Sequence, residues 1–424
     1  MKPFFADLHI HIGRTESGRP VKITAARDLT FANIARECVV RKGIDIAGIV
    51  DCGSPPVIHE IRGMIESGEM VELPGGGLRY NGAVGAGFVK PASAGFTNPA
   101  PNSTTVILAC ELETVEADGS ASHHIAYFPG LREIEVFVGL AYRRVTNAEL
   151  SSQRCGVPAR ELVKMALTAG AAFVPAHAFT PHKSPYGSCV RRLSGMFGDE
   201  GLAKLAAVEL GLSADSYLAD RIAELAPLTF LSNSDAHSLP KIAREYNVLS
   251  LEEPSFEEVV KALRREEGRR VVANYGLDPR LGKYHRTFCL KCEQVVHTPP
   301  PALACPLCGG DEIVKGVLDR IAEIADYPEP KPPAHRPPYH YQVPLQFLPG
   351  IGAVALGKLL NRFGTEMRVL HQTDRRELEL VVGRKLADLI VAAREGTLPL
   401  LAGGGGRYGK AVAHGSEAQI SMGL

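Results

Sequence analysis

The sequence predicts an α/β protein in which a large module of repeated βα units is followed by two smaller modules. Three observations support this prediction. Short apolar runs alternate with amphipathic helical patterns up to about Tyr275. Two CxxC pairs then follow at 289–308, and a Pro-Gly-Ile-Gly turn stands at 349–352 ahead of a helical pattern. Repeated βα units form either a closed barrel or an open sheet, and the pattern by itself leaves both open.

Periodicity and capping residues place the elements of the first module. Apolar residues follow helical spacing from Phe31 until Gly43, and an apolar strand pattern comes directly after that glycine. A second helix is predicted over 158–168, followed by a strand that ends in AAFVPAH. Ser255 and Glu258 form a capping box, which predicts the start of a further helix.

Composition excludes several classes of protein. The 424 residues are enough for two or three domains of about 150 residues. Lys and Arg together number 47, as do Asp and Glu, so any contact with nucleic acid must come from local patches. All apolar runs fall short of the ~18–20 residues of a membrane helix. MKPFFADLHIH has no signal-peptide pattern and the nine cysteines suggest no disulfide framework, so we expect a cytoplasmic protein without a membrane partner.

Residues with metal-binding side chains recur where apolar runs end, in FFADLHIH, IAGIVDC, TVILACELE, HHIAYF, AAFVPAH and LTFLSNSDAH. Strand ends converge on one face of a βα barrel, where active sites are built. A single histidine at a strand end is more often structural, but six such ends in one chain favour a metal site. Imidazole and carboxylate ligands suit divalent ions, and a shared carboxylate can hold two of them about 3.5–4 Å apart. The predicted ligands are His9, His11, Asp51, Glu111, His124, His177, Asp235 and His237.

Strand geometry refines this prediction only in part. His9 and His11 are two residues apart, so both point to the same side of an extended strand. Glu113 and His123 stand next to the favoured ligands Glu111 and His124, and we do not expect them to bind metal.

The ligand pattern resembles the PHP (polymerase and histidinol phosphatase) family. The resemblance implies a distorted (βα)7 barrel that binds two or three divalent ions (zinc, manganese or magnesium) and hydrolyses phosphate esters. It implies a first ion held by His9, His11, Glu111 and Asp235, and a second held by Glu111, His124 and His177, with Glu111 bridging. The third position keeps His237 and Asp51 but has Ser17 and Cys52 where the family often has histidine. The catalytic residues expected from the resemblance are His9, Glu111, His177 and Asp235.

Four cysteines predict a structural zinc site in a ribbon. Cys289, Cys292, Cys305 and Cys308 have the spacing C-x₂-C-x₁₂-C-x₂-C, which supplies two knuckles and four thiolates for tetrahedral zinc. The preceding DPRLGKYHRTF interleaves basic and aromatic residues, as nucleic-acid-binding surfaces do. Two interpretations of this segment are equally supported. It either contacts DNA through Arg280, Lys283 and Tyr284, or it is a solvated turn that leads into the ribbon.

The segment 347–365, FLPGIGAVALGKLLNRFGT, resembles a helix-hairpin-helix. Gly350 and Gly352 would let the turn present backbone N–H groups to a DNA phosphate, and Lys358 lies where such motifs often have a basic residue. A degenerate second copy follows at 374–385. GGGGRYGK, at 403–410, lacks the strand and helix of a phosphate loop, so a flexible turn is expected.

These features divide the chain into consecutive regions. QVPLQF, at 342–347, loosely resembles a sliding-clamp peptide, although an extended entry into the helix-hairpin-helix is the favoured interpretation. The expected regions are a barrel at 1–275 with a flexible insertion at 83–105, a zinc ribbon at 276–326, a stiff extended Pro-rich linker at 327–345, a helix-hairpin-helix domain at 346–400, and a Gly-rich tail at 401–424.

The order of these modules resembles the bacterial branch of the endonuclease Q family. DLHIHIGRTESG, NYGLDPRLGKYH and PPYHYQVPLQFLPGIG carry the resemblance. It implies a DNA repair endonuclease that cleaves the phosphodiester bond on the 5′ side of a deaminated base (hypoxanthine, uracil or xanthine) or an abasic site by metal-assisted hydrolysis. Lys183, Arg191 and Arg192, just past His177, are then expected to contact the flanking phosphates.

Two other classes of function remain open at this point. A small-molecule phosphatase of the histidinol-phosphate type would explain the barrel but gives the ribbon and the helix-hairpin-helix no purpose. A non-catalytic DNA-binding accessory protein would explain the C-terminal modules, but it leaves the ligand pattern of the barrel without a use.

Overall fold

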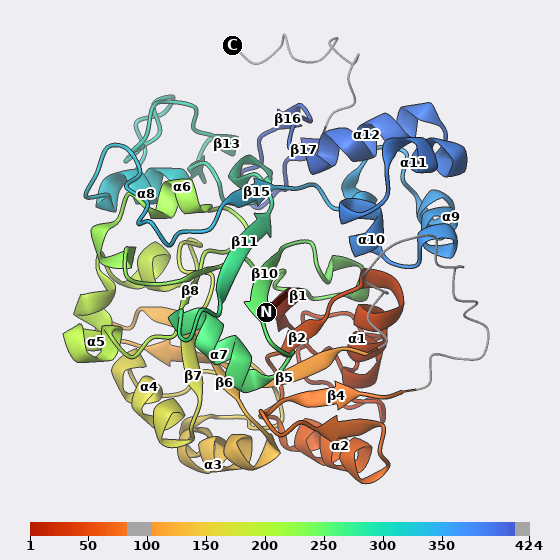
Figure 1. The fold of residues 1–424 in the computed structure, drawn as a ribbon. Helices are drawn as coiled ribbons and strands as arrows, with labels where there is room; N and C mark the ends of the chain where they lie inside the picture. Colours follow the sequence, from red (N-terminus) through yellow and green to blue (C-terminus); the bar gives the residue numbers. More distant parts are fainter. Residues whose placement is uncertain (83–102, 412–424) are drawn as a thin grey trace.

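The computed structural model describes residues 1–82 and 103–411, and a barrel of short strands with helices around it fills the lower half of Figure 1. The barrel strands are β1 (Lys2–Ile10), β2 (Ile46–Ile49), β5 (Thr105–Val115), β6 (Ala121–Phe128), β7 (Ala172–Pro175), β8 (Val208–Glu209) and β9 (Phe230–Leu231). Most of the predicted flexible insertion, residues 83–102, lies outside the described residues.

The strands close into a distorted ring. β1, β2 and β5 are parallel neighbours, whereas β6 lies antiparallel between β5 and β7. Beyond β7, Ala206 N donates to Phe173 O at 2.9 Å next to the parallel pair β8–β9. Ile10 forms a parallel bridge with Ala236, just after β9, and this contact returns the ring to β1. The predicted α/β barrel is therefore confirmed, and the antiparallel β6 is its main departure from regular βα repetition.

Further strands extend the sheet outside the ring. β10 (Tyr246–Leu251) pairs with β1, and β11 (Arg270–Gly276) and β15 (Tyr339–Tyr341) follow in order. β3 (Met70–Glu72) and β4 (Leu78–Tyr80) continue the other edge beside β5. The surrounding helices are α1 (Phe31–Glu37), α2 (Pro55–Glu66), α3 (Leu131–Ala141), α4 (Ala159–Thr168), α5 (Leu193–Leu202), α6 (Ser216–Ala219) and α7 (Phe256–Arg264).

Local sequence signals account for the ends of these helices. Thr30 Oγ1 accepts a hydrogen bond from Asn33 N at the start of α1. The predicted helix divides into α1 and a π-helical turn, η1 (Cys38–Lys42), and it ends at Gly43, whose φ of 78° is left-handed. Ser255 caps α7 through the Glu258 amide, as predicted. The other short turns are η2 (Tyr142–Arg144), η3 (Pro185–Cys189), η4 (Ala223–Leu225), η5 (Leu239–Lys241), η6 (Pro279–Leu281) and η7 (Leu345–Phe347).

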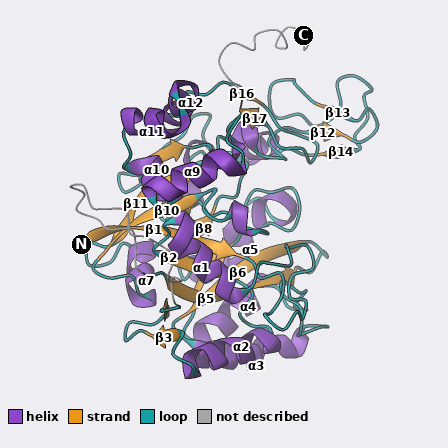
Figure 2. Cartoon of the chain, turned by 90° about the vertical axis from the view of Figure 1, so that its right-hand side faces the viewer, coloured by secondary structure: helices purple, strands orange, loops and turns teal. Residues whose placement is uncertain are grey.

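The C-terminal part lies above the barrel, with the ribbon strands on one side and the last helices on the other (Figure 2). The ribbon has β12 (Phe288–Cys289), β13 (Gln294–Val295) and β14 (Ile313–Val314), followed by α8 (Val317–Ile324). The helical region consists of α9 (Ala353–Phe363), α10 (Glu366–His371), α11 (Arg375–Val382) and α12 (Arg384–Arg394), and the hairpin β16 (Leu400–Leu401) and β17 (Lys410–Ala411) follows. In the described part of the chain, every helix is too short or too polar to cross a bilayer.

The Pro-rich segment is extended but is not a free linker. Its last residues form β15, which pairs in parallel with β11. Arg336 is buried against Asp220, with Nη2 and Oδ1 2.9 Å apart, and its guanidinium lies 3.3 Å from the centre of the Phe230 ring. Proline stiffness therefore delivers a strand to the edge of the barrel sheet rather than a spacer between domains.

Two further segments of the C-terminal region are bonded to other parts of the chain. The clamp-like QVPLQF segment lies against the barrel sheet, because Gln342 and Leu345 are buried and Gln342 Oε1 accepts a hydrogen bond from Tyr246 Oη at 2.6 Å. The segment 403–410, expected to be a flexible turn, belongs to the β16–β17 hairpin and is hydrogen-bonded to the chain that leads into the ribbon.

Candidate metal centre and substrate cavity

Two groups of ligand-type side chains meet at the strand ends of the barrel. The first group is His9, His11 and Asp235, and the second is Glu111, His123 and His177; within each group the ligand atoms lie within 4.8 Å of one another. His9 comes from β1, Glu111 from β5 and His123 from β6, whereas the remaining three follow strand ends. His177 and Asp235 have left-handed backbones with φ of 29° and 45°, a strain that clusters at functional sites.

The Glu111 carboxylate lies between the two groups. Its Oε1 atom is 3.0 Å from His123 Nδ1 and 3.5 Å from His177 Nε2. The same oxygen is 3.6 Å from His9 Nε2, and Oε2 is 3.7 Å from His11 Nε2. Asp235 Oδ1 faces the same two imidazoles at 3.7 and 3.4 Å. Glu111 thus lies between the two groups, at the position where the resemblance to the PHP family implies a bridging ligand.

The structure corrects the assignment of His124. Its Nε2 atom bonds to Ser122 Oγ at 2.8 Å and Thr114 Oγ1 at 3.1 Å, and its ring stacks on Phe173. Burial lowers the pKa of His124 to about 3. The side chain therefore lies in the helix-facing core and not in the metal centre.

Strand register explains why His123 takes the place of His124. β5 and β6 pair so that Glu113 is opposite His123 and Leu112 is opposite His124. Directly paired residues share a face of the sheet, and faces alternate along each strand. Glu111 and Glu113 therefore share a face with His123. Glu113 Oε2 is 3.5 Å from His123 Nε2 and also bonds Lys183 Nζ at 2.8 Å.

Asp51 and Glu209 lie behind the imidazoles. Asp51 Oδ2 is 3.0 Å from His11 Nδ1, on the opposite side of the ring from Asp235, so Asp51 orients His11 instead of joining the ligand group. Glu209, which sequence reasoning missed, is 2.9 Å from His9 Nδ1 and accepts from His177 N at 3.1 Å. The only available signal for Glu209 was its position at the end of the short apolar run AAVEL.

The described residues do not gather a third ligand group in the barrel, since the remaining cluster of ligand-type side chains is the four cysteines. His237 Nδ1 bonds to Asp235 O at 3.1 Å, and its ring packs 4.4 Å from that of His11. Because Asp51 is bonded to the far side of the His11 ring, it does not join His237 in a ligand group for a third ion.

The donor set and its charge fit divalent cations. Burial disfavours charge on both Glu111 and His9, but their neighbours outweigh it. His123 and Lys22 hold the pKa of Glu111 well below its usual range, and Glu209 with Asp235 raises the pKa of His9 to about 10. Within the described part of the chain, His123 Nε2 is buried and makes no hydrogen bond, although Glu113 Oε2 lies 3.5 Å away. Imidazole and carboxylate groups arranged in this way suit zinc or manganese.

Lys22 is a further site residue that the sequence did not reveal. Its Nζ atom is 3.3 Å from Glu111 Oε2 and 2.6 Å from Ser152 Oγ. Ser152 also donates to Glu111 Oε2 and has a left-handed φ of 48°. Lys22 and Ser152 together fix Oε2 of this carboxylate, and Oε1 is directed at His9, His123 and His177.

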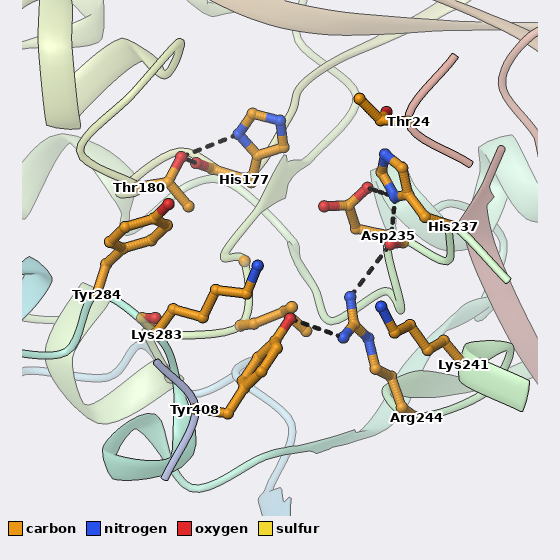
Figure 3. A pocket seen from close by; sticks show the side chains of 13 residues that line it. Thr24, His177, Thr180, Asp235, His237, Lys241, Arg244, Lys283, Tyr284 and Tyr408 are labelled. Carbon is orange, nitrogen blue, oxygen red and sulfur yellow. Dashed lines mark hydrogen bonds and ion pairs between the residues drawn. The ribbon is translucent and has the colours of Figure 1, made fainter. Parts of the chain in front are cut away.

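A cavity of about 330 Å³ opens beside the metal centre (Figure 3). One wall holds His177, Asp235 and His237, and the facing wall holds Lys241, Arg244, Lys283, Tyr284 and Tyr408. The barrel, the segment before the ribbon and the Gly-rich tail each contribute to the lining. The cationic and aromatic side chains of the second wall suit an anionic ligand with a planar group.

The predicted DNA-contact residues fall into two sets. Lys283 and Tyr284 line the cavity, which favours the functional interpretation of their segment over a solvated turn. Arg280 instead pairs with Asp278, two residues away, with Nη2 and Oδ2 2.7 Å apart. Arg191 and Arg192 bond to backbone and acidic groups at 323–326 and so join the barrel to the end of α8, outside the lining of the cavity.

The ribbon cysteines converge as the spacing predicts. Cys289 Sγ is 3.8 Å from Cys308 Sγ, and Cys305 Sγ is 3.9 Å from Cys292 Sγ. All four sulfur atoms lie within 4.8 Å of one another, a separation that suits one tetrahedral ion.

The helical region offers two helix N-termini at one groove of about 470 Å³. Gly350, with a φ of 88°, leads into α9, whose N-cap Gly352 provides no side-chain cap. Gly383 joins α11 to α12 and likewise leaves the start of α12 without a side-chain cap. Lys358 is exposed and lines the groove. Only the three-residue turn η7 stands where a helix-hairpin-helix has its first helix.

Comparisons with known proteins identify the family. A family model described as PHP-associated matches residues 216–267. The Bacillus subtilis protein YqxK, described as uncharacterized, is 45% identical over 415 residues, which are 97% of this chain and 99% of YqxK. The crystal structure of the lesion-specific endonuclease PfuEndoQ from Pyrococcus furiosus has a TM-score of 0.79 and 32% identity, covering 99% of this chain and 98% of that chain. The chain belongs to the endonuclease Q family.

A second solved endonuclease Q structure was determined with DNA. It is a complex with a 27-mer duplex substrate that has an abasic lesion at the active site. Its TM-score is 0.77 at 33% identity, and the match covers 97% of this chain and 96% of that chain. The likeness to endonuclease Q therefore extends over the barrel, the ribbon and the helical region together.

Proposed function

We propose that this protein is a metal-dependent DNA repair endonuclease that hydrolyses the phosphodiester bond on the 5′ side of a damaged nucleotide. The proposed lesions are hypoxanthine, uracil, xanthine and abasic sites. The observation that carries the proposal is the Glu111 carboxylate, shared by two ligand groups beside a cavity with cationic and aromatic walls. Membership of the endonuclease Q family supports the same reaction class.

The two ligand groups provide two ion positions. His9, His11 and Asp235 would hold one ion, and His123 with His177 would hold the other, with Glu111 between them. When bound, a pair of divalent ions (zinc, manganese or magnesium) supplies charge stabilisation for the phosphate and a nucleophile at neutral pH. The tetrahedral cysteine cluster would hold one structural zinc.

The chain itself orients these groups and handles protons. Asp51 and Glu209 fix the ring orientation of His11 and His9, which directs both Nε2 atoms to the metal centre. Lys22 holds one oxygen of Glu111. The Asp235 side chain is 30% exposed and faces the cavity, so it is the group best placed to accept a proton from an attacking water.

The cavity is proposed to receive one nucleotide taken out of the base stack. Its volume lies at the low end of the range for small-molecule sites, which suits one nucleotide rather than a duplex. Arg244 and Lys283 would neutralise phosphate oxygens, and Tyr284 would contact the base or the sugar. Extrusion costs less where a base is damaged or missing, and this difference favours lesions.

The helical region is proposed to hold the undamaged duplex on either side of the lesion. The two uncapped helix N-termini would each face a backbone phosphate, because their free N–H groups and helix dipoles favour anions. Lys358 adds a positive charge at the same groove.

Strand cleavage of end-labelled duplexes tests this function. One duplex carries a single deoxyinosine and another is unmodified, each with Mg²⁺ or Mn²⁺ and with chelator. We expect a nick directly 5′ of the lesion that chelator removes, and no nick in Asp235→Asn. Asp118→Asn, in an exposed turn, is the matched control and should cleave normally. Deoxyuridine, deoxyxanthosine and abasic duplexes then establish the order of lesions.

The same assay decides between the alternatives. A phosphatase would hydrolyse a simple phosphate monoester and leave both duplexes intact, but the cavity lining contributed by Lys283 and Tyr284 argues against a barrel-only enzyme. A non-catalytic accessory protein would bind DNA without any metal-dependent turnover, and the two well-formed ligand groups argue against it.

A further inference from the structure

The Gly-rich C-terminal segment reaches the substrate cavity. After α12 the chain turns back, and β16 and β17 pair next to the segment that leads into the ribbon. Three glycine amides of this segment donate to backbone carbonyls of that segment. Gly403 N donates to Arg280 O at 2.6 Å, Gly409 N to Leu281 O at 3.0 Å, and Gly406 N to Lys283 O at 3.2 Å. A Cβ atom on Gly409 would lie 2.7 Å from the Arg280 carbonyl oxygen. Glycine is therefore needed because the two backbones touch.

This docking puts Tyr408 on the cavity wall. Figure 3 shows its ring between Lys283 and Arg244, with the phenol directed at the guanidinium. Arg244 Nη1 donates to the Tyr408 hydroxyl at 3.0 Å, and Lys283 Nζ lies 4.9 Å from the ring centre. The chain thus connects its tail to two of the cations that line the cavity.

Arg244 connects Tyr408 to the metal centre. The side chain is buried, and it donates through Nε to Ser234 O at 2.6 Å and through Nη2 to Asp235 O at 3.1 Å. Asp235 has a left-handed backbone, so these two bonds support a strained loop. A guanidinium has five N–H donors, and the three bonds leave two for a ligand in the cavity.

We propose that Tyr408 is a positioning residue that acts through Arg244 on the loop that presents Asp235. The hydroxyl of Tyr408 completes the hydrogen bonding of one Nη atom and fixes the plane of the guanidinium, which in turn holds the loop and directs its two free N–H groups at a substrate phosphate. The inference rests on the proposed function for its effect on catalysis, but the effect on the loop is independent of it.

Tyr408→Phe isolates the hydroxyl, since the ring and its contact with Lys283 remain. We expect kcat on the deoxyinosine duplex to fall roughly tenfold, the size of one hydrogen bond to a charged group, with KM within about twofold. Tyr217→Phe removes an exposed phenol that bonds to Glu329 on the Pro-rich segment, and it is the matched control. In Arg244→Lys the guanidinium is absent, so adding Tyr408→Phe should change kcat no further.

Hydrogen exchange gives a readout that does not depend on cleavage. Amides of the peptide 230–240 should exchange faster in Tyr408→Phe and Arg244→Lys than in the wild type. Their exchange rates should be unchanged in Tyr217→Phe. Unchanged exchange in Tyr408→Phe, an unchanged kcat, or effects that multiply in the double variant would each overturn the proposal. If the wild type cuts no lesion, the proposed function fails and the exchange of this peptide alone decides whether Tyr408 holds the loop.

Discussion

The neighbouring histidines of β6 provide a direct test of the metal centre. His123 and His124 are adjacent in the chain, but one faces Glu111 at 3.0 Å and the other bonds to Ser122 and Thr114 in the core. Replacing each in turn by leucine makes a matched pair of the same chemistry. We expect His123→Leu to lose metal and activity, and His124→Leu to keep both.

The expected magnitudes follow from the contacts. His124→Leu loses two hydrogen bonds of about 1 kcal/mol each, but Thr114 and Ser122 still bond to each other at 3.2 Å. Because the unfolding entropy of a chain of 424 residues is about 0.9 kcal/mol/K, a loss of about 1–2 kcal/mol should lower Tm by only about 1–2 °C. His123→Leu removes one of the three donors of its group. Loss of a residue behind a ligand already costs about 10–100-fold in affinity or activity, so loss of the ligand should cost at least as much.

Metal content by mass spectrometry, cleavage rate and thermal melting measure the three quantities on the same preparations. His123→Leu should recover part of its rate when the divalent ion is raised well above the wild-type requirement. If His124→Leu lost a metal equivalent and its activity while His123→Leu kept them, the β5–β6 register and the ligand groups built on it would be wrong.

Three other predictions test separate parts of the molecule. Cys305→Ser should lose one zinc equivalent, and it should lose activity because the ribbon supports the preceding segment, whose Lys283 and Tyr284 line the cavity. Cys189→Ser should keep both the zinc and the activity. Equal zinc contents in the two variants would reject the ribbon site. Burial raises the pKa of Glu245 to about 8 from an ordinary 4.5, so the folded protein holds a proton that the unfolded chain releases, and stability should fall as pH rises from about 5 to 8. Glu245→Gln should flatten that fall in Tm, and identical pH profiles would contradict it. Lys358→Met should lower the slope of a log–log plot of DNA affinity against salt by about one, while Lys204→Met, at an exposed position just after α5, should leave the slope unchanged. Equal slopes for both variants would remove the α9 groove from the DNA contact.

The sequence by itself determined the fold class and the chemistry of the site. Alternating apolar runs and capped helices set the βα order, and the strand ends put imidazole and carboxylate groups at one face of a barrel. The shared position of Glu111 came from the resemblance to the PHP family, whereas the pairing of His9 with His11 and the convergence of the four cysteines follow from spacing alone. These features are local, because strand alternation and knuckle spacing do not depend on which distant segment packs nearby.

Only the tertiary structure decided which of the adjacent residues His123 and His124 faces the site. Alternation fixes that His123 and His124 point to opposite faces, but the register of β6 on β5 chooses between them. Asp51 became a support for His11, and Glu209 and Lys22 entered the site, through contacts that span 40 to 200 residues of chain. Such contacts leave no periodic trace in the sequence, because each depends on where two remote backbones meet. The cavity wall is the clearest example: Tyr408 meets Arg244 only because a glycine-rich tail can lie directly against the segment before the ribbon.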